Sequence, residues 1–306
     1  MTLLVVGSLA FDSVETPFGK REKVLGGSAN YCAMAASLLT KVQVVGVVGE
    51  DFPHDHLDYL KTRGVDVEGV QRVPGKTFHW SGRYSFDLNE AHTLETHLNV
   101  FANFRPTLPA AYRRPEHVFL GNIDPELQSL VLDQIERPKL VAMDTMNYWI
   151  TSKRAQLLEV AKRVDVLFVN DAEARQLSGE HNVVKAGAAI RKMGPKVVII
   201  KRGEYGALML EHGKAFFAPA FPLEDVFDPT GAGDTFAGGV MGSLDRWGGL
   251  GETTARQAMV MGGVMASFVV EDFSFDRVRK VSLEDLEERY AELRRFTTFK
   301  ELPTRE

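Results

Sequence analysis

The sequence predicts an α/β fold, with a doubly wound, mostly parallel sheet flanked by helices and a small additional β-sheet. Short runs rich in Val, Ile and Leu alternate with longer amphipathic stretches, and these runs read LLVV, VQVVGVVG, HVFLGN, KLVAMD, VDVLFVN and KVVIIKRG. Near-continuous apolar runs suit strands that are buried on both faces. Their alternation with helical stretches favours a parallel sheet covered by helices.

Polar residues follow several of these apolar runs. Asp12 lies shortly after the first run, Asp144 follows KLVAM, and Asn170 follows VDVLFV. In open α/β sheets, ligands bind beyond the carboxyl ends of the strands. We therefore expect these side chains to converge on one cleft.

One stretch departs from the alternation of strands and helices. Residues 77–87 read TFHWSGRYSFD, with the aromatic residues on one face, and this period of two indicates a half-exposed strand. Residues 11–24 also read as extended, with a Pro-Phe-Gly turn in the middle. We expect a single domain over residues 1–306, in which segments of approximately 11–25 and 72–106 form a small lid sheet. The alternative is an ordinary edge strand or a subunit contact, and exposed strand edges would suit a homodimer through the lid.

The composition is typical of a soluble globular protein. Of the 306 residues, 44% are hydrophobic and 25% are charged, which is enough apolar material for a large core. The formal net charge of -5 leaves no excess of Lys and Arg to bind nucleic-acid phosphates. Cys32 is the only cysteine, so no intramolecular disulfide can form and a reducing compartment fits. No stretch approaches the ~20 apolar residues of a membrane-spanning helix, so we expect a cytoplasmic protein with no membrane partner.

The most informative segment is residues 228–239, which read DPTGAGDTFAGG. Small residues and glycines let backbone N–H groups approach an anion, and a helix that begins there directs the positive end of its dipole to the same place. Asp234 would repel phosphate if the segment only bound anions. Its presence makes sense if it accepts a proton from a nucleophile that attacks the bound phosphorus atom. The alternative is a carboxylate that merely stabilises the first turn of a helix.

This segment resembles the C-terminal signature of the ribokinase-like (PfkB) carbohydrate kinases. The resemblance implies that Asp234 is the general base. It also implies an anion hole formed by Gly231, Ala232 and Gly233, and a phosphate and cation end that includes Asp228 and Thr230. The cofactors that it implies are ATP and Mg²⁺, and in many members a monovalent cation such as K⁺.

Two N-terminal pieces match the family's acceptor-binding residues. Gly26 and Gly27 followed by Asn30 resemble a glycine pair and Asn, although the spacing to Asn30 is one residue shorter than usual. Glycines let a polyol approach the backbone, and an amide bonds a hydroxyl as donor and acceptor. Asp12 matches the acid that bonds two substrate hydroxyls, since a carboxylate has two accepting oxygens. The alternatives are a turn with an N-capping residue and an Asp that caps a helix.

The nucleotide end is implied by weaker matches. Asn170 and Glu173 fit the family's N-x-x-E motif, in which the Glu acts through water on Mg²⁺ and the phosphates. The alternative is an ordinary helix start with Asn as the N-cap. Asp228 is a second candidate contact to the metal. Lys201, Gly203 and Gly206 lie in KRGEYG, where the family has a T-x-G-x-x-G-like turn and where Lys replaces the usual Thr; a hairpin between VVII and ALML is equally compatible.

The resemblance implies an ATP-dependent kinase that transfers the γ-phosphoryl group to a hydroxyl of a small sugar. A nucleoside kinase of the adenosine, cytidine or inosine type is the alternative, because aromatic side chains on the lid could stack on a base. The other interpretation of these side chains is that they form the packed face of the lid. A binding protein of the same fold without turnover is a third possibility, which an intact Asp234 and anion loop argue against.

Overall fold

The computed structural model describes residues 2–89 and 91–300. In that part of the chain, the main sheet has nine strands in the order β13-β12-β11-β10-β9-β8-β1-β4-β5. The strands are β1 (Thr2–Val6), β4 (Lys41–Val48), β5 (Val65–Arg72), β8 (His117–Leu120), β9 (Leu140–Met143), β10 (Val166–Asn170), β11 (Val197–Lys201), β12 (Ala207–Glu211) and β13 (Lys214–Ala218). All pairs from β5 across to β11 are parallel, and β12 and β13 are antiparallel at one edge. The predicted fold class is confirmed.

The strand order reverses at β1. Along the chain, β1 is followed in the sheet by β4 and β5 on one side, and the chain then returns to β8 on the other side. Such a reversal opens a crevice beyond the carboxyl ends of the strands, because the flanking connections leave in opposite directions. The fold therefore places its ligand cleft beside the ends of β1 and β8.

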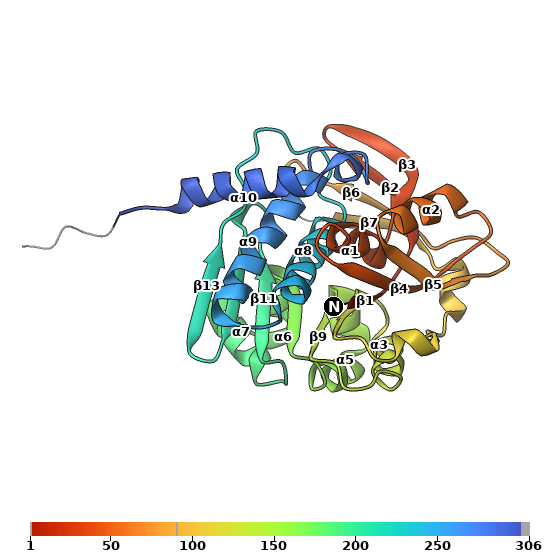
Figure 1. Cartoon of the computed structure of the whole chain (residues 1–306), viewed down its shortest axis with the longest axis horizontal. Helices are drawn as coiled ribbons and strands as arrows, with labels where there is room; N and C mark the ends of the chain where they lie inside the picture. The colour runs from red at the N-terminus through yellow and green to blue at the C-terminus, as the bar shows by residue number, and fades with distance from the viewer. Residues whose placement is uncertain (1, 90, 301–306) are drawn as a thin grey trace, which may run out of the picture.

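A smaller sheet lies over this end of the molecule (Figure 1). Within the described residues it has four strands in the order β3-β2-β6-β7, which are β2 (Ala10–Thr16), β3 (Gly19–Gly26), β6 (His79–Tyr84) and β7 (Ala91–His97). The two segments that the sequence marked as extended do pair, because β2 runs parallel to β6. We call these four strands the lid sheet.

Helices cover both faces of the main sheet. One apolar core cluster joins the sheet to α1 (Ser28–Ala36), α2 (His54–Thr62), α8 (Ala232–Trp247) and α9 (Glu252–Val269). A second cluster, on the other face, joins it to α3 (Pro125–Leu132), α4 (Asn147–Ser152), α5 (Arg154–Ala161), α6 (Asp171–Ser178) and α7 (Val183–Arg191). The helix α10 (Leu283–Thr297) packs on α9, and the Ser282 side chain caps its first turn.

Glycines in α8 fix the place where that helix begins. A Cβ on Gly238 would lie 2.4 Å from the Cys32 carbonyl oxygen of α1, and a Cβ on Gly239 would lie 2.9 Å from the Gly262 Cα of α9. The three helices can therefore pack closely, with α1 buried along its whole length. The second glycine pair of the DPTGAGDTFAGG segment thus serves helix packing, which holds the start of α8 at the cleft.

Candidate active site

The start of α8 is built to receive an anion. Gly231 is the N-cap residue with φ of 75°, and a Cβ there would lie 2.4 Å from the ring of Tyr31, so only glycine fits. Ala232 donates its N–H to the Pro229 carbonyl. Among the described residues, no backbone carbonyl accepts from the N–H groups of Gly231 and Gly233. Free amides at the positive end of a 16-residue helix form an anion-binding site.

Asp234 lies in the first turn of α8, beside these amides. Burial, together with the charge of Asp144 and against the opposing Lys201 ammonium, raises the pKa of its carboxyl to about 7. A proton acceptor works best when its pKa is near the working pH. The position and the pKa of Asp234 therefore suit a general base beside the anion site.

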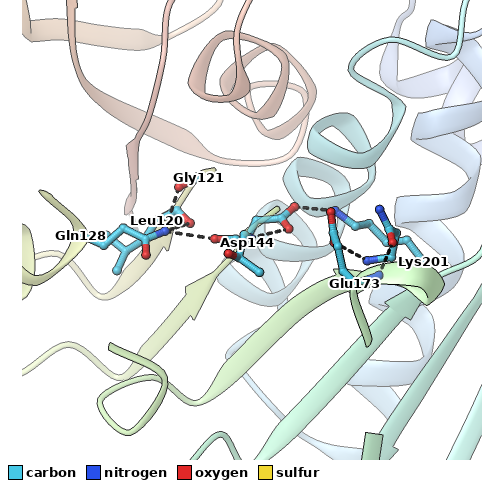
Figure 2. A network of polar contacts seen from close by, with 8 residues as sticks. Leu120, Gly121, Gln128, Asp144, Glu173 and Lys201 are labelled. Atoms are coloured by element: carbon cyan, nitrogen blue, oxygen red, sulfur yellow. Dashed lines mark hydrogen bonds and ion pairs between the residues drawn. The ribbon is translucent and has the colours of Figure 1, made fainter. Parts of the chain in front are cut away.

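A charged network lies next to Asp234 at the ends of β9, β10 and β11 (Figure 2). The Lys201 Nζ donates to the Asp144 Oδ2 at 2.5 Å, with 18% and 3% of the two side chains exposed. Burial disfavours the ammonium, but Asp144, Glu173 and Asp234 together raise the pKa of Lys201 above its usual value. A Cβ on Gly233 would lie 3.1 Å from the Lys201 Nζ. The positive charge of Lys201 therefore lies against the anion loop.

The buried amide of Gln128 supports this network from α3. Its Nε2 donates to the Gly121 and Asp144 carbonyls, both at 3.0 Å, and so ties together the ends of β8 and β9. The Asp144 Oδ1 accepts from the N–H of Thr145 at 2.8 Å. Asp144 is thus held at its backbone and at both carboxylate oxygens, which orients it toward Lys201.

Asn170 and Glu173 form a capping box at the start of α6. The Asn170 Oδ1 accepts from the Glu173 N–H at 2.8 Å, and the Glu173 Oε2 accepts from the Asn170 N–H at 2.7 Å. Burial raises the pKa of the Glu173 carboxyl to about 7, although the nearby Lys201 lowers it. The capping alternative from the sequence is therefore real, and the second carboxylate oxygen of Glu173 remains beside the charged network.

The acceptor end of the cleft centres on Asp12, in β2. Asp12 is 5% exposed, and burial raises the pKa of its carboxyl to about 8, with Asp228 and Asp234 adding to the shift and the Gly27 N–H opposing it. A Cβ on Gly26 would lie 1.9 Å from the Asp12 Oδ2. The first glycine of the pair is therefore required so that the acid can lie against the backbone.

Asn30 has two hydrogen-bond partners within the protein. Its side chain is fully buried, its Nδ2 donates to the Gly26 carbonyl at 3.2 Å, and its Oδ1 accepts from the His56 Nε2 at 2.8 Å. The Arg279 Nη2 donates to the other ring nitrogen of His56, and burial with Arg279 lowers the pKa of His56 to about 4. The structure therefore gives Asn30 a neutral histidine partner and a role in fixing the Gly26 carbonyl.

The lid sheet contacts the phosphate-binding segment. The Thr230 Oγ1 and the Tyr84 Oη at the end of β6 are 3.3 Å apart. The Thr230 N–H donates to the Asp228 Oδ1 at 2.9 Å, while the buried Asp228 Oδ2 has no partner among the described residues. Burial raises the pKa of Asp228. The end of β6 therefore contacts the residues just before α8, and one carboxylate oxygen of Asp228 is available for a ligand.

Gly203 and Gly206 form the turn between β11 and β12, which is the hairpin that the sequence offered as an alternative. Both have positive φ, at 54° and 84°. A Cβ on Gly203 would lie 2.7 Å from the Asn89 Oδ1 of the loop between β6 and β7. The turn therefore lies against the loop that joins β6 to β7.

Sequence reasoning missed several residues of the cleft. Tyr31 packs against Gly231 but was part of an ordinary helical stretch, and Gln128 carries no motif. Asp144 was noted only as a polar residue after a strand.

None of the helices in the described ranges has the length and apolar character needed to cross a bilayer. The same ranges contain no cluster of three or more His, Cys, Asp or Glu residues arranged to hold a metal ion.

A doubly wound sheet whose cleft joins an anion-binding helix start to a buried base is the arrangement of a kinase that phosphorylates a small alcohol. Comparison with known proteins leads to the same class. The pfkB family carbohydrate kinase profile matches residues 3–275, and the chain belongs to that family. It is an ATP-dependent kinase of the sugar or nucleoside class.

Individual relatives cover most of the chain. A cytidine kinase of Thermococcus kodakarensis is 33% identical over 252 residues, which are 80% of this chain and 89% of the relative. A nucleoside kinase structure of Burkholderia thailandensis, in complex with ADP and inosine, has a TM-score of 0.76 at 17% identity and covers 95% of both chains. An E. coli protein provisionally named Ribokinase II, in complex with ATP and Mg²⁺, has a TM-score of 0.75 at 17% identity and covers 95% of this chain and 99% of its own.

Proposed function

We propose that this protein is a nucleoside kinase, which transfers the γ-phosphoryl group of ATP to a hydroxyl on the ribose of a nucleoside. The observation that carries the proposal is the position of Trp80 on the lid sheet. Asp12 and Trp80 are register partners in the parallel pair of β2 and β6, so their side chains point to the same face of the lid. An aromatic platform beside the acid that binds sugar hydroxyls suits an acceptor that has both a sugar and a base.

The indole ring of Trp80 lies across strand β6 of the lid sheet. A Cβ on Gly82 would lie 2.2 Å from the indole ring, so the ring lies across the strand over a residue that has no side chain. The indole Nε1 donates to the Thr93 Oγ1 on β7 at 3.1 Å, which fixes its orientation. An aromatic ring that stacks on a base contributes about 1–3 kcal/mol and tolerates different bases. The name of the cytidine kinase relative agrees with this reading.

In this mechanism the acceptor is held by Asp12 and by the backbone at Gly26 and Gly27. Its reactive hydroxyl meets Asp234, which takes the proton as the oxygen attacks the γ-phosphorus. The amides at residues 231–233 stabilise the charge that spreads over the transferring phosphoryl oxygens. Lys201 lies against the same loop and neutralises part of that charge.

The phosphate chain of ATP would run from the start of α8 toward Asn170 and the turn at Gly203 and Gly206, with Thr230 beside it. Mg²⁺ keeps several waters and takes few protein ligands. One free carboxylate oxygen from each of two acidic residues is therefore enough to hold it. Glu173, through water, and Asp228 would hold the ion, which neutralises phosphate charge when bound. The partnerless Asp228 Oδ2 is the observation that supports this fit.

Two finer proposals concern the cation and the assembly. A monovalent cation such as K⁺ would bind near Asp228 and raise turnover, which a comparison of KCl with NaCl at equal ionic strength tests.

The edge strand β7 is exposed along its whole length, and an exposed edge is commonly covered by a partner. A homodimer through the lid would show twice the mass of one chain in light scattering.

The acceptor can be identified by measuring the rate of ADP release with each of five compounds, namely cytidine, adenosine, inosine, ribose and fructose. We expect kcat/KM to be highest for a nucleoside. Trp80→Leu should lower kcat/KM about 5- to 100-fold for nucleosides and leave the value for ribose unchanged. His79→Ala is the matched control, because His79 lies on the opposite face of β6 and bonds Ser13.

Other outcomes separate the remaining candidates. A preference for ribose or fructose, with no effect of Trp80→Leu, would make the protein a sugar kinase, as the name of the family allows. Mg-ATP binding without phosphate transfer to any of these compounds would favour a binding protein.

A further inference from the structure

The ring of Tyr31 is held between α1 and the start of α8. Tyr31 is the fourth residue of α1 and is 2% exposed. Its ring packs on Phe275 in a tilted arrangement, with 4.4 Å between the centroids, and lies against the N-cap Gly231 of α8. Helix α1, the start of α8 and the segment before α10 therefore fix the ring from three directions.

The hydroxyl of Tyr31 is buried without a hydrogen-bond partner among residues 2–89 and 91–300. Burial raises its pKa well above the usual range, and the charges of Asp12, Asp228 and Asp234 raise it further. The group is therefore a neutral O–H donor at any physiological pH. A buried unpaired hydroxyl costs free energy, and native proteins generally satisfy such a group unless a ligand does so.

The charges of Asp12 and Asp234 act on this hydroxyl, and both groups have a part in the proposed function. Asp12 holds the acceptor in the proposed function, and Asp234 takes its proton. Asn30, one residue earlier, has its amide committed to the Gly26 carbonyl and to His56. Among the residues of α1, it is Tyr31 whose polar group is both unpaired and close to the two acids.

We propose that the Tyr31 hydroxyl donates a hydrogen bond to an acceptor hydroxyl oxygen between Asp12 and Asp234, and so selects acceptors that have a hydroxyl there. This inference rests on the proposed function, because it deepens the acceptor site of that reaction. Acids and a neutral donor complement each other here, since a sugar hydroxyl can donate to a carboxylate and accept from the tyrosine at the same time.

The first test is Tyr31→Phe, which removes the hydroxyl and keeps the ring. We expect the KM for the acceptor to rise about 3- to 12-fold, the range of one neutral hydrogen bond, with the KM for ATP unchanged. The melting temperature should stay the same or rise, because the variant loses a buried unpaired group. Tyr112→Phe is the matched control, since Tyr112 is a buried tyrosine in the core on the other face of the sheet.

The second test pairs the variant with acceptors that lack one hydroxyl. Cytidine, 2′-deoxycytidine and 3′-deoxycytidine are compared in the wild-type protein and in Tyr31→Phe. For one deoxy compound, the effects on the acceptor KM of removing the acceptor hydroxyl and of removing the tyrosine hydroxyl should be non-additive. Both changes remove the same hydrogen bond. Equal effects of Tyr31→Phe on all three acceptors would overturn the proposal, as would a variant that unfolds or melts well below the wild type.

The two proposals fail in different ways. A wild-type protein that phosphorylates ribose and no nucleoside rejects the nucleoside assignment. The same cycle is then run with ribose and 2-deoxyribose, in which additive effects reject the role of Tyr31 and non-additive effects support it. A wild-type protein that phosphorylates no acceptor rejects both.

Discussion

Replacing Asp234 with Asn separates its chemical role from its structural one. The substitution keeps the size of the side chain but replaces the carboxylate, which can accept a proton, with a neutral amide. A positioned base contributes about 10²- to 10⁴-fold to the rate, so we expect kcat to fall by that factor while ATP binding is retained. Coupled measurement of ADP release gives kcat, and calorimetric titration gives the affinity for ATP.

The same variant should be more stable than the wild type at high pH. Burial raises the pKa of Asp234 from 3.8 to about 7, so the folded protein binds this proton more tightly than the unfolded chain. Wild-type stability is therefore lost as the pH rises from about 4 to about 7. At ~1.4 kcal/mol per pKa unit, the full loss is about 4 kcal/mol, and partial solvent screening reduces it to roughly 1–4 kcal/mol.

Urea unfolding of both proteins at pH 5 and pH 8 checks this expectation. The advantage of Asp234→Asn should be larger at pH 8 than at pH 5, and a gain in stability would show that lost activity is not misfolding. Full turnover in the variant would refute the base assignment. Equal stability at both pH values would refute the buried, pKa-raised environment from which the assignment was made.

The remaining predictions concern the pH profile and two further positions. The kcat/KM of the wild type should rise with pH through about 7, as Asp234 loses its proton, and the residual activity of Asp234→Asn should lack this rise. Gly26→Ala should raise the KM for the acceptor at least ~10-fold and spare ATP binding, because the new Cβ would lie 1.9 Å from the Asp12 Oδ2; unchanged acceptor kinetics would contradict this geometry. Lys201→Met should cost about 3–5 kcal/mol of stability by leaving a buried Asp144 unpaired. Adding Asp144→Asn should restore stability in thermal unfolding without restoring turnover.

The sheet could be predicted because its strands are buried on both faces. A run such as VVII between two charged residues has no other stable place in a protein of this size, so the apolar runs at residues 42–48 and 197–200 became β4 and β11. The neighbours of each strand could not be read in the same way. Strand order depends on which connections cross which face, and apolar runs of equal character do not encode it.

The charged network shows this limit at the level of single residues. Asp144 and Lys201 are 57 positions apart in the chain and meet only because β9, β10 and β11 are neighbours in the sheet. The sequence marked Lys201 as a departure from the family's usual Thr but gave it no partner. The structure supplies a reason to keep a cation there, since a lysine held by a buried carboxylate lies against the anion loop.

At the acceptor end, sequence reasoning did not single out Tyr31 for a different reason, which is the geometry of one helical turn. Successive residues of a helix point about 100° apart, so neighbouring residues of one helix have different surroundings. In α1, which begins at Ser28, Asn30 faces His56 and the Gly26 carbonyl, and Tyr31 faces the start of α8. The motif match names Asn30, and the phase of the helix adds Tyr31 as the second contact that we propose.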